Sequence, residues 1–198
     1  MPTLSRKADH PINPLFLARW SPRAFSEAPI PERELFQLFE AARWAPSAFN
    51  AQPWRFLYAR RDTKHWPAFL DLLHPFNRVW AHRAAALVIV LSRREIVSAR
   101  DGSRTASHSH SFDAGAATAY LALEGARIGW HAHMMTGFDI EAAAERLNIP
   151  SDHRIEAAIA IGRMGDPNCL DEKLRSRESP NGRLGTRELV FEGPLPVS

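Results

Sequence analysis

Two continuous apolar runs set the strongest limit on how this chain can fold. The first covers residues 84–91, with Leu87-Val88-Ile89-Val90-Leu91 at its centre, and the second covers residues 155–164. A short apolar run that does not alternate with polar residues is typical of a strand buried on both faces of a sheet. The sequence therefore predicts two strands in the interior of a sheet.

Helical periodicity and aromatic runs predict the elements around these strands. We expect helices over residues 30–43, 66–73, 77–83, 111–127 and 140–147, and further strands over residues 54–59 and 131–135. In the clearest helix, 111–127, Ser111 is the expected N-cap, Asp113 lies in the first turn and Gly129 follows the C-terminal end. The interior of this helix is rich in alanine and glycine, so a second helix can approach it closely, in the core or at a subunit interface.

Two other segments are less regular. Residues 93–110 are polar, and we expect a long mobile loop that could act as a lid over a site. The charged C-terminal tail ends in the strand-like run Glu188-Leu189-Val190-Phe191. We expect this apolar strand to pair with a sheet and not to remain unpaired in solvent. The sheet of a partner subunit is one candidate.

Length and composition are those of a globular protein. The chain has 198 residues, of which 45% are hydrophobic and 24% charged. This suits a single domain over residues 1–198, with an N-terminal arm over 1–14 and a C-terminal tail over 166–198. The net charge of +3 is scattered along the chain, which argues against a nucleic-acid surface and weakly favours an anionic ligand.

The sequence also bears on location. We find no apolar signal core at the N-terminus and no run that approaches the ~20 apolar residues of a membrane helix. The single cysteine, Cys169, cannot form an internal disulfide, so we expect a reducing, cytoplasmic location. Cys169 follows a Gly-Asp-Pro-Asn turn, which does not favour a catalytic thiol.

Two H-x-H pairs, His108 with His110 and His131 with His133, raise the question of a metal site. The first pair lies in the polar segment, and neither has an acidic or cysteine partner at the spacing that known zinc sites require. We therefore expect no metal.

The segment Trp44–Trp54 is dense in groups that recognise ligands. Pro46 and Pro53 fix their own φ angles and push the preceding residues out of the helical region, so we expect a stiff, extended segment. Asn50 and Gln52 offer amide donors and acceptors suited to the edge of a flat heterocycle. A tight turn with aromatic packing beneath it is the other interpretation.

A second ligand-binding pattern lies nearer the N-terminus. Arg19 and Arg23 bracket Ser21 in a segment that Pro22 stiffens. Two guanidinium groups and a hydroxyl suit a phosphate clamp, because arginine presents a planar fork of donors to oxygen atoms. Two solvated surface arginines would give the same pattern.

Together, these motifs resemble those of the FMN-dependent nitroreductases over nearly all of the chain. The matching segments follow the family's order: Arg19-x-Ser21-x-Arg23-x-Phe25, Pro46-Ser47-Ala48-x-Asn50-x-Gln52-Pro53-Trp54, Asn77, Asp113-x-Gly115-Ala116-Ala117 and Arg183. The segment His133-x-Met135-x-Gly137-Phe138-Asp139 is similar to a subgroup with an H-x-M-x-G-F-D motif.

The resemblance implies a nitroreductase-like α+β fold, in which helices flank a mostly antiparallel central sheet and two chains intertwine as a homodimer. It implies FMN as the cofactor and NADH or NADPH as the electron donor. Hydride would pass from the nicotinamide to the flavin and then to a nitroaromatic, quinone or similar acceptor, in a ping-pong cycle. Because the cofactor carries this chemistry, no catalytic side chain is assigned.

The resemblance also implies residue roles. The FMN phosphate and ribityl chain would contact Arg19, Trp20, Ser21, Arg23 and Arg183. The flavin ring would lie near Asn77, Met134, Met135, Thr136 and Gly137. The other subunit would supply Pro46, Ser47, Ala48 and Asn50, with Gln52 supporting their loop. The substrate pocket would include Phe49 and His133.

One position departs from the family. Many members have a lysine near the flavin N1 and O2 atoms, three residues after the asparagine, and this chain has Trp80 there. Arg83 or a backbone dipole is the candidate replacement for that charge. Two other functions stay open on the sequence: a relative with different flavin chemistry, such as dehalogenation or flavin cleavage, and a non-catalytic flavin-binding dimer.

Overall fold

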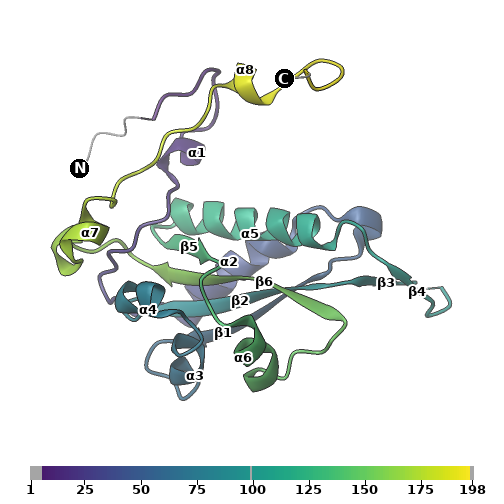
Figure 1. Ribbon diagram of the computed structural model, residues 1–198, viewed down its shortest axis with the longest axis horizontal. Coiled ribbons are helices and arrows are strands. Elements are labelled where there is room, and N and C mark those ends of the chain that lie inside the picture. The colour runs from purple at the N-terminus through teal and green to yellow at the C-terminus, as the bar shows by residue number, and fades with distance from the viewer. Residues whose placement is uncertain (1–5, 99, 197–198) are drawn as a thin grey trace.

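A four-stranded antiparallel sheet forms the centre of the computed structural model, which describes residues 6–98 and 100–196 (Figure 1). Across the sheet the strands are, in order, β1 (Trp54–Arg60), β2 (Ala86–Arg93), β6 (His153–Gly162) and β5 (His131–Met135). The strands predicted from the apolar runs are β2 and β6, and both occupy the interior of the sheet, which confirms that prediction.

Strand β2 is buried because its alternate side chains enter two separate cores. Leu87, Ile89 and Leu91 belong to one core, and Val88 and Val90 belong to the other. The first core is closed by α3 (Trp66–Leu70), α4 (Pro75–Ala81) and α6 (Ile140–Arg146). The second core is closed by α2 (Glu32–Arg43) and α5 (His110–Arg127). Helices therefore cover both faces of the sheet, which confirms the predicted α+β architecture.

Most predicted elements are present, with each end within three residues of its predicted position. One N-cap assignment is wrong, because α5 begins at His110 and Ser109, not Ser111, precedes it. Gly129 follows this helix with a φ of 84°, in agreement with its predicted role as the C-terminal stop. Among the described residues, no helix combines the length and apolar character needed to cross a membrane.

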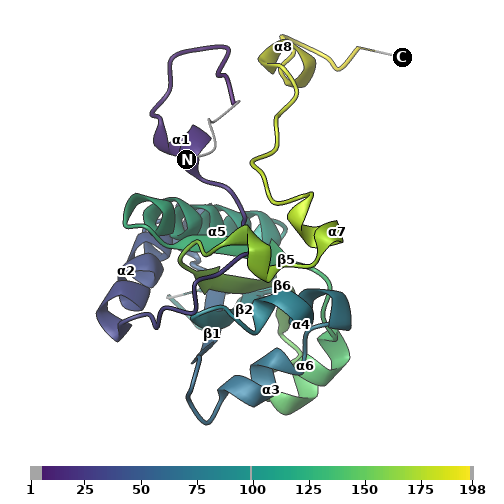
Figure 2. The ribbon, with the colours of Figure 1, turned by 90° about the vertical axis from the view of Figure 1, so that its left-hand side faces the viewer.

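The N-terminal arm and the C-terminal tail run away from the sheet beside each other (Figures 1 and 2). The short helix α1 (Leu15–Ala18) follows the arm, and the tail carries η2 (Pro167–Cys169), α7 (Glu172–Arg175) and α8 (Thr186–Leu189). The strand predicted over Glu188–Phe191 is wrong, because α8 occupies its first half. The Gly185 N–H donates to Glu188 Oε1 at 2.7 Å, a local bond that favours a helical turn. Residues 1–5 of the predicted arm and 197–198 of the predicted tail lie outside the described part.

The polar segment 93–110 is ordered by a hairpin, which corrects the prediction of a long mobile loop. Strands β3 (Glu95–Val97) and β4 (Arg104–Ala106) pair antiparallel, and Asp101-Gly102 lies in the turn between them. Gly102 has a φ of 73°, and the dipeptide Asp-Gly is a known turn signal. The sequence therefore contained the signal, although the surrounding polar residues obscured it.

Residues 46–52, which we name the Phe49 turn, are also not extended as predicted. Residues Ala48–Asn50 form a single 3₁₀ turn, η1. Phe49, Asn50 and Gln52 have φ angles of 53°, 52° and 47°. Such left-handed conformations cost on the order of 1–3 kcal/mol for residues other than glycine and cluster at functional sites. The two prolines thus bound a strained turn and do not extend the whole segment.

Candidate functional site

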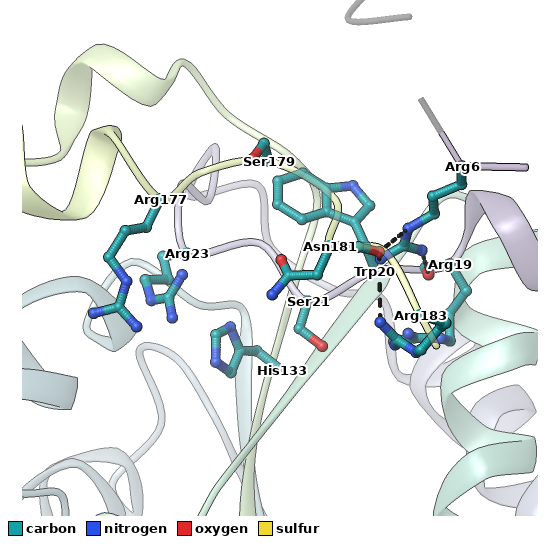
Figure 3. A pocket seen from close by; sticks show the side chains of 10 residues that line it. All are labelled: Arg6, Arg19, Trp20, Ser21, Arg23, His133, Arg177, Ser179, Asn181 and Arg183. Carbon is teal, nitrogen blue, oxygen red and sulfur yellow. Dashed lines mark hydrogen bonds between the residues drawn. The ribbon is translucent and has the colours of Figure 1, made fainter. Parts of the chain in front are cut away.

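A cavity of about 190 Å³, which we name the arginine cavity, lies where the N-terminal arm meets the C-terminal tail (Figure 3). Six predicted site residues line it: Arg19, Trp20, Ser21, Arg23, His133 and Arg183. Four other residues complete it: Arg6, Arg177, Ser179 and Asn181. The fold therefore assembles the two arginine segments that the sequence singled out, together with new neighbours.

Positive charge gathers in the arginine cavity, and most of its arginines have no carboxylate partner among the described residues. Within the described residues, Arg6, Arg19 and Arg183 form no ion pair with Asp or Glu. Burial and then the Arg183 charge lower the pKa of Arg19. Burial, followed by the charges of Arg183 and Arg19, lowers the pKa of Arg6. These groups stay cationic, and their mutual repulsion makes the cavity a candidate anion site.

Arg23 differs from these arginines because it has an acidic partner. The Glu178 carboxylate lies 3.8 Å from Arg23 Nη1, and only 2% of the glutamate side chain is exposed. The same carboxylate accepts the backbone N–H groups of Arg23 and Ala24 at 2.7 and 2.8 Å. Glu178 therefore fixes the backbone beside the cavity and balances part of the Arg23 charge. Arg19 and Arg183, the two that the sequence predicted, are left with Arg6 and Arg177 as cavity cations that have no carboxylate partner among the described residues.

The histidines of β5 are neutral at physiological pH. Burial lowers the pKa of His133 to about 4, although hydrogen bonding to the Pro22 carbonyl, 2.9 Å from Nδ1, opposes the shift. Because a carbonyl can only accept, the proton lies on Nδ1. Burial also lowers the pKa of His131. Within the described ranges, no cluster of three or more His, Cys, Asp or Glu side chains is suited to a metal ion.

A second group of predicted residues lies between α4 and the turn after β5. Asn77 is buried, and its Nδ2 donates to the Gly137 carbonyl at 3.0 Å. A Cβ at Gly137 would lie 2.4 Å from Phe76 Cζ, so this position has no room for a side chain. Met135 is buried in the core below, and Thr136 is exposed. This turn therefore presents mainly backbone groups, held in place by Asn77.

Met134, near the C-terminal end of β5, is partly buried and packs against the core that α2 and α5 close. The position of the family lysine holds Trp80, which is 1% exposed and packs against Phe25 and His133. Arg83 does not replace the missing charge, because its guanidinium lies 2.7 Å from the Glu27 carboxylate. Trp80 is thus a core residue, and the charge of Arg83 is already balanced.

The Phe49 turn, which includes Pro46, Ser47, Ala48, Asn50 and Gln52, does not line the arginine cavity. The turn lies at the N-terminal end of α5, where the buried Asp113 carboxylate accepts the Ala48 N–H at 3.2 Å. The Phe49 side chain is 91% exposed. The turn thus combines backbone strain with an exposed aromatic side chain. Within one chain, the predicted phosphate-binding residues therefore lie apart from this turn.

The sequence analysis missed four residues that line the arginine cavity. Asn181-Gly182 before Arg183 is a turn signal that could have marked this part of the tail. We see no comparable signal for Arg6, which is one of many scattered arginines, nor for Arg177 and Ser179.

A profile of the Nitroreductase family matches residues 17–163 of this chain. The match spans most of the sequence, from the first arginine motif through the last strand of the sheet. The chain belongs to the nitroreductase family. The antiparallel sheet flanked by helices is the nitroreductase-like fold that the sequence predicted, and the family assignment is confirmed.

Individual relatives agree with membership of the nitroreductase family. The crystal structure of an oxidoreductase containing FMN is 42% identical, with a TM-score of 0.95 and complete coverage of both chains. An uncharacterised 15.4 kDa protein of Mycolicibacterium smegmatis is 36% identical over 115 residues, 58% of this chain and 74% of its own. A nitroreductase of Desulfovibrio desulfuricans, solved with FMN, shares the fold at 24% identity and a TM-score of 0.70, covering 94% of this chain and 100% of its own. FMN is therefore bound in structural relatives of this protein.

Proposed function

We propose that this protein is an FMN-dependent oxidoreductase that transfers a hydride from NADH or NADPH to a nitroaromatic, quinone or similar small acceptor. The observation that carries the proposal is the arginine cavity, where Arg19 and Arg183 lack carboxylate partners among the described residues. A phosphate group supplies both the missing negative charge and acceptor oxygens for planar guanidinium donors. The FMN in the 42% identical structure supports the choice of ligand.

The cavity residues fit the phosphate end of FMN. Arg19 and Arg183 would bind phosphate oxygens, and the Ser21 hydroxyl and the Trp20 segment would meet the ribityl chain. Arg23 would add a weaker attraction, because Glu178 balances part of its charge. This ranking differs from the sequence-based proposal, in which the three arginines were equivalent.

The flavin ring would lie against the Asn77 turn. Asn77 and the backbone of Met134–Gly137 would offer polar groups to the ring edge, in keeping with the H-x-M-x-G-F-D subgroup. Because Gly137 packs closely on Phe76, this position has no room for a side chain, and its backbone groups stay uncovered by one. Neutral His133 beside the cavity adds no positive charge to the substrate pocket.

Bound FMN would supply the two-electron chemistry, accepting a hydride from the nicotinamide and passing it to the acceptor. The residues of the chain would bind the cofactor, orient the substrates and exclude water from the site. Phe49 would offer a flat apolar face against which an aromatic acceptor stacks. A single pocket that serves donor and acceptor in turn would give parallel lines in steady-state plots, as a ping-pong cycle requires. Intersecting lines would contradict a shared pocket.

The proposal includes a cytoplasmic homodimer in which Pro46, Ser47, Ala48 and Asn50 reach the flavin of the partner, with Gln52 as support. The separation of the Phe49 turn from the arginine cavity within one chain supports this arrangement. The outer face of α5 also supports it, since Phe112 is 81% exposed beside the small exposed residues Gly115 and Ala119. In such a dimer the arm would stay on its own domain. The tail, residues 166–198, would line its own chain's cavity at residues 177–183 and then extend onto the partner.

Light scattering tests the dimer directly. Ala119→Leu should overpack an α5 contact across a two-fold axis and weaken association by about 1–3 kcal/mol. Ala122 is not an equivalent site, because it is 2% exposed in the core. A wild-type protein that stays monomeric at micromolar concentration would contradict the dimer.

Flavin titration tests the ligand. FMN and riboflavin differ only in the phosphate, so a charge-assisted phosphate contact worth ~1.5–3 kcal/mol should make FMN bind about one to two decades more tightly. The change in flavin fluorescence on binding gives both dissociation constants. Equal affinities for the two flavins would contradict the phosphate assignment of the arginine cavity.

A further inference from the structure

Arg6 makes an unusual set of contacts at the edge of the arginine cavity. Its Nε donates to the Asn181 carbonyl at 2.7 Å, and its Nη1 donates to the carbonyls of Leu17 and Arg19 at 3.1 and 2.7 Å. One guanidinium group thus joins three segments: the arm, the C-terminal end of α1 and the tail. Asn181 and Arg6 are 175 positions apart in the chain. The fork of donors on arginine is suited to such a bridge, whereas a lysine ammonium is a single point charge.

The placement of Arg6 has an electrostatic cost. Arg6 adds a further positive charge beside Arg19 and Arg183, and burial, followed by the charges of Arg183 and Arg19, lowers the pKa of Arg6. A residue that served only to attract an anion would gain more by pointing its donors into the cavity. The three carbonyl contacts instead direct them to the backbones that carry Arg19 and Arg183.

Other ties between arm and tail near this point are few in the described structure. The Asp9 carboxylate accepts the Thr186 N–H at 2.7 Å, a few residues further along the tail. Arg183 itself donates to the Gly182 carbonyl at 2.7 Å, a bond that holds its side chain to its own segment only. The position of Arg183 next to Arg19 therefore depends strongly on Arg6.

We infer that Arg6 is a positioning residue that assembles the phosphate clamp by fastening the Arg183 segment of the tail to the backbone of Arg19. This inference rests on the proposed function, because it assigns Arg6 a role in the phosphate site of that same cavity. Arg6 acts through Arg183 and does not itself bind the phosphate.

The test is a double-mutant cycle on the full-length chain, freed of flavin and titrated with FMN and with riboflavin. Arg6→Ala should weaken FMN binding about tenfold, close to the loss of one charge-assisted contact, and leave riboflavin binding unchanged. The double variant of Arg6→Ala with Arg183→Ala should bind FMN no more weakly than Arg183→Ala alone, because both changes remove the same contact. Asp9→Ala is the matched control, because it removes the hydrogen bond between the arm and Thr186 of the tail, away from the cavity. This variant should keep most of the preference for FMN over riboflavin.

Arg6→Lys separates positioning from charge. It keeps the cation and the fold, but its ammonium holds all its donors on one nitrogen and does not reproduce the separate Nε and Nη1 positions that reach the three carbonyls, so its FMN affinity should fall nearly as far as that of Arg6→Ala. An Arg6→Lys variant with the wild-type preference for FMN would overturn the inference. Equal weakening of FMN and riboflavin, or additive losses in the cycle, would also overturn it. A wild-type protein that binds both flavins equally would instead refute the proposed phosphate site itself, so the two failures are distinguishable.

Discussion

The arginine cavity and the Phe49 turn both hold groups in arrangements that cost free energy, but they are built differently. In the cavity, like charges come together from an arm and a tail, and the fastening bonds join segments 175 positions apart. In the turn, the unfavourable φ angles fall within four consecutive residues, and the buried Asp113 at the start of α5 anchors them. The core of the fold thus holds the turn in place. The positive charges of the cavity, in contrast, would be balanced by a bound anionic ligand.

This difference predicts that changes in the cavity will act on ligand binding and changes at the turn will act on stability. The largest effect should follow Arg19→Ala, which removes a cation that has no carboxylate partner among the described residues. FMN affinity should fall by ~1.5–3 kcal/mol while the free energy of unfolding stays nearly constant. Arg43→Ala is the control, because Arg43 pairs with Glu40 on the exposed surface of α2. Fluorescence titration measures the affinity, and a similar loss in both variants would break the comparison.

Asp113→Ala should show the opposite pattern. It leaves the Ala48 N–H and the Ser109 hydroxyl without their acceptor, at a cost of about 1–3 kcal/mol of unfolding free energy. The preference for FMN over riboflavin should persist, because the cavity does not contain this residue. Asp101→Ala offers a matched control at an exposed turn, where Asp101 accepts from Ser103. If denaturant unfolding gives equal stability for the two variants, Asp113 is not an anchor.

His133 gives the cavity side a pH dependence. Its pKa of about 4 in the folded protein lies below the ordinary value of 6.5. Between these values the unfolded chain binds more protons, so stability should fall as the pH falls from about 6.5 to about 4. His133→Asn keeps a donor toward the Pro22 carbonyl and should remove this dependence, which amounts to about 1.4 kcal/mol for each pH unit between the two values. Denaturant unfolding at several pH values measures it, and an unchanged pH profile would contradict a neutral, enclosed His133.

The smallest effect concerns strain at Phe49. Because glycine accepts a φ of 53° without cost, Phe49→Gly should be more stable than Phe49→Ala by about 1 kcal/mol. Phe36 on α2 is the control, where helix propensity should favour alanine over glycine by a similar amount. Both Phe49 variants should keep FMN and alter the choice of acceptor. The same order of alanine and glycine at both positions would show that the turn is not strained.

The sequence predicted the fold well because hydrophobic patterns report burial. The continuous runs in β2 and β6 and the small residues of α5 each have a direct physical consequence in the packed structure. The errors fall where local chemistry competes with the pattern. Glu188 bonds the Gly185 N–H, which makes a helical turn of an apolar segment that reads as a strand.

The candidate site was predictable only in part. Arg19 and Arg183 stood out through motifs, but the pairing of Arg23 with Glu178 joins positions 155 apart and leaves no local pattern. The contact of Arg6 with Asn181 spans 175 positions, and all three Arg6 contacts run to backbone carbonyls, which every residue possesses. The strain of the Phe49 turn was hidden because Pro46 and Pro53 also suit an extended chain.

The most direct test of the account is reduction of the flavin-loaded protein in the absence of oxygen. We expect NADPH or NADH to bleach the visible flavin absorbance, and a quinone or nitroaromatic added afterwards to restore it. The same experiment on Arg19→Ala loaded with excess FMN should show the reaction again, because that residue binds the phosphate and not the reacting ring. Flavin that stays oxidised with both nicotinamides, yet is bleached by dithionite, would contradict the assignment of this protein as a nicotinamide-dependent oxidoreductase.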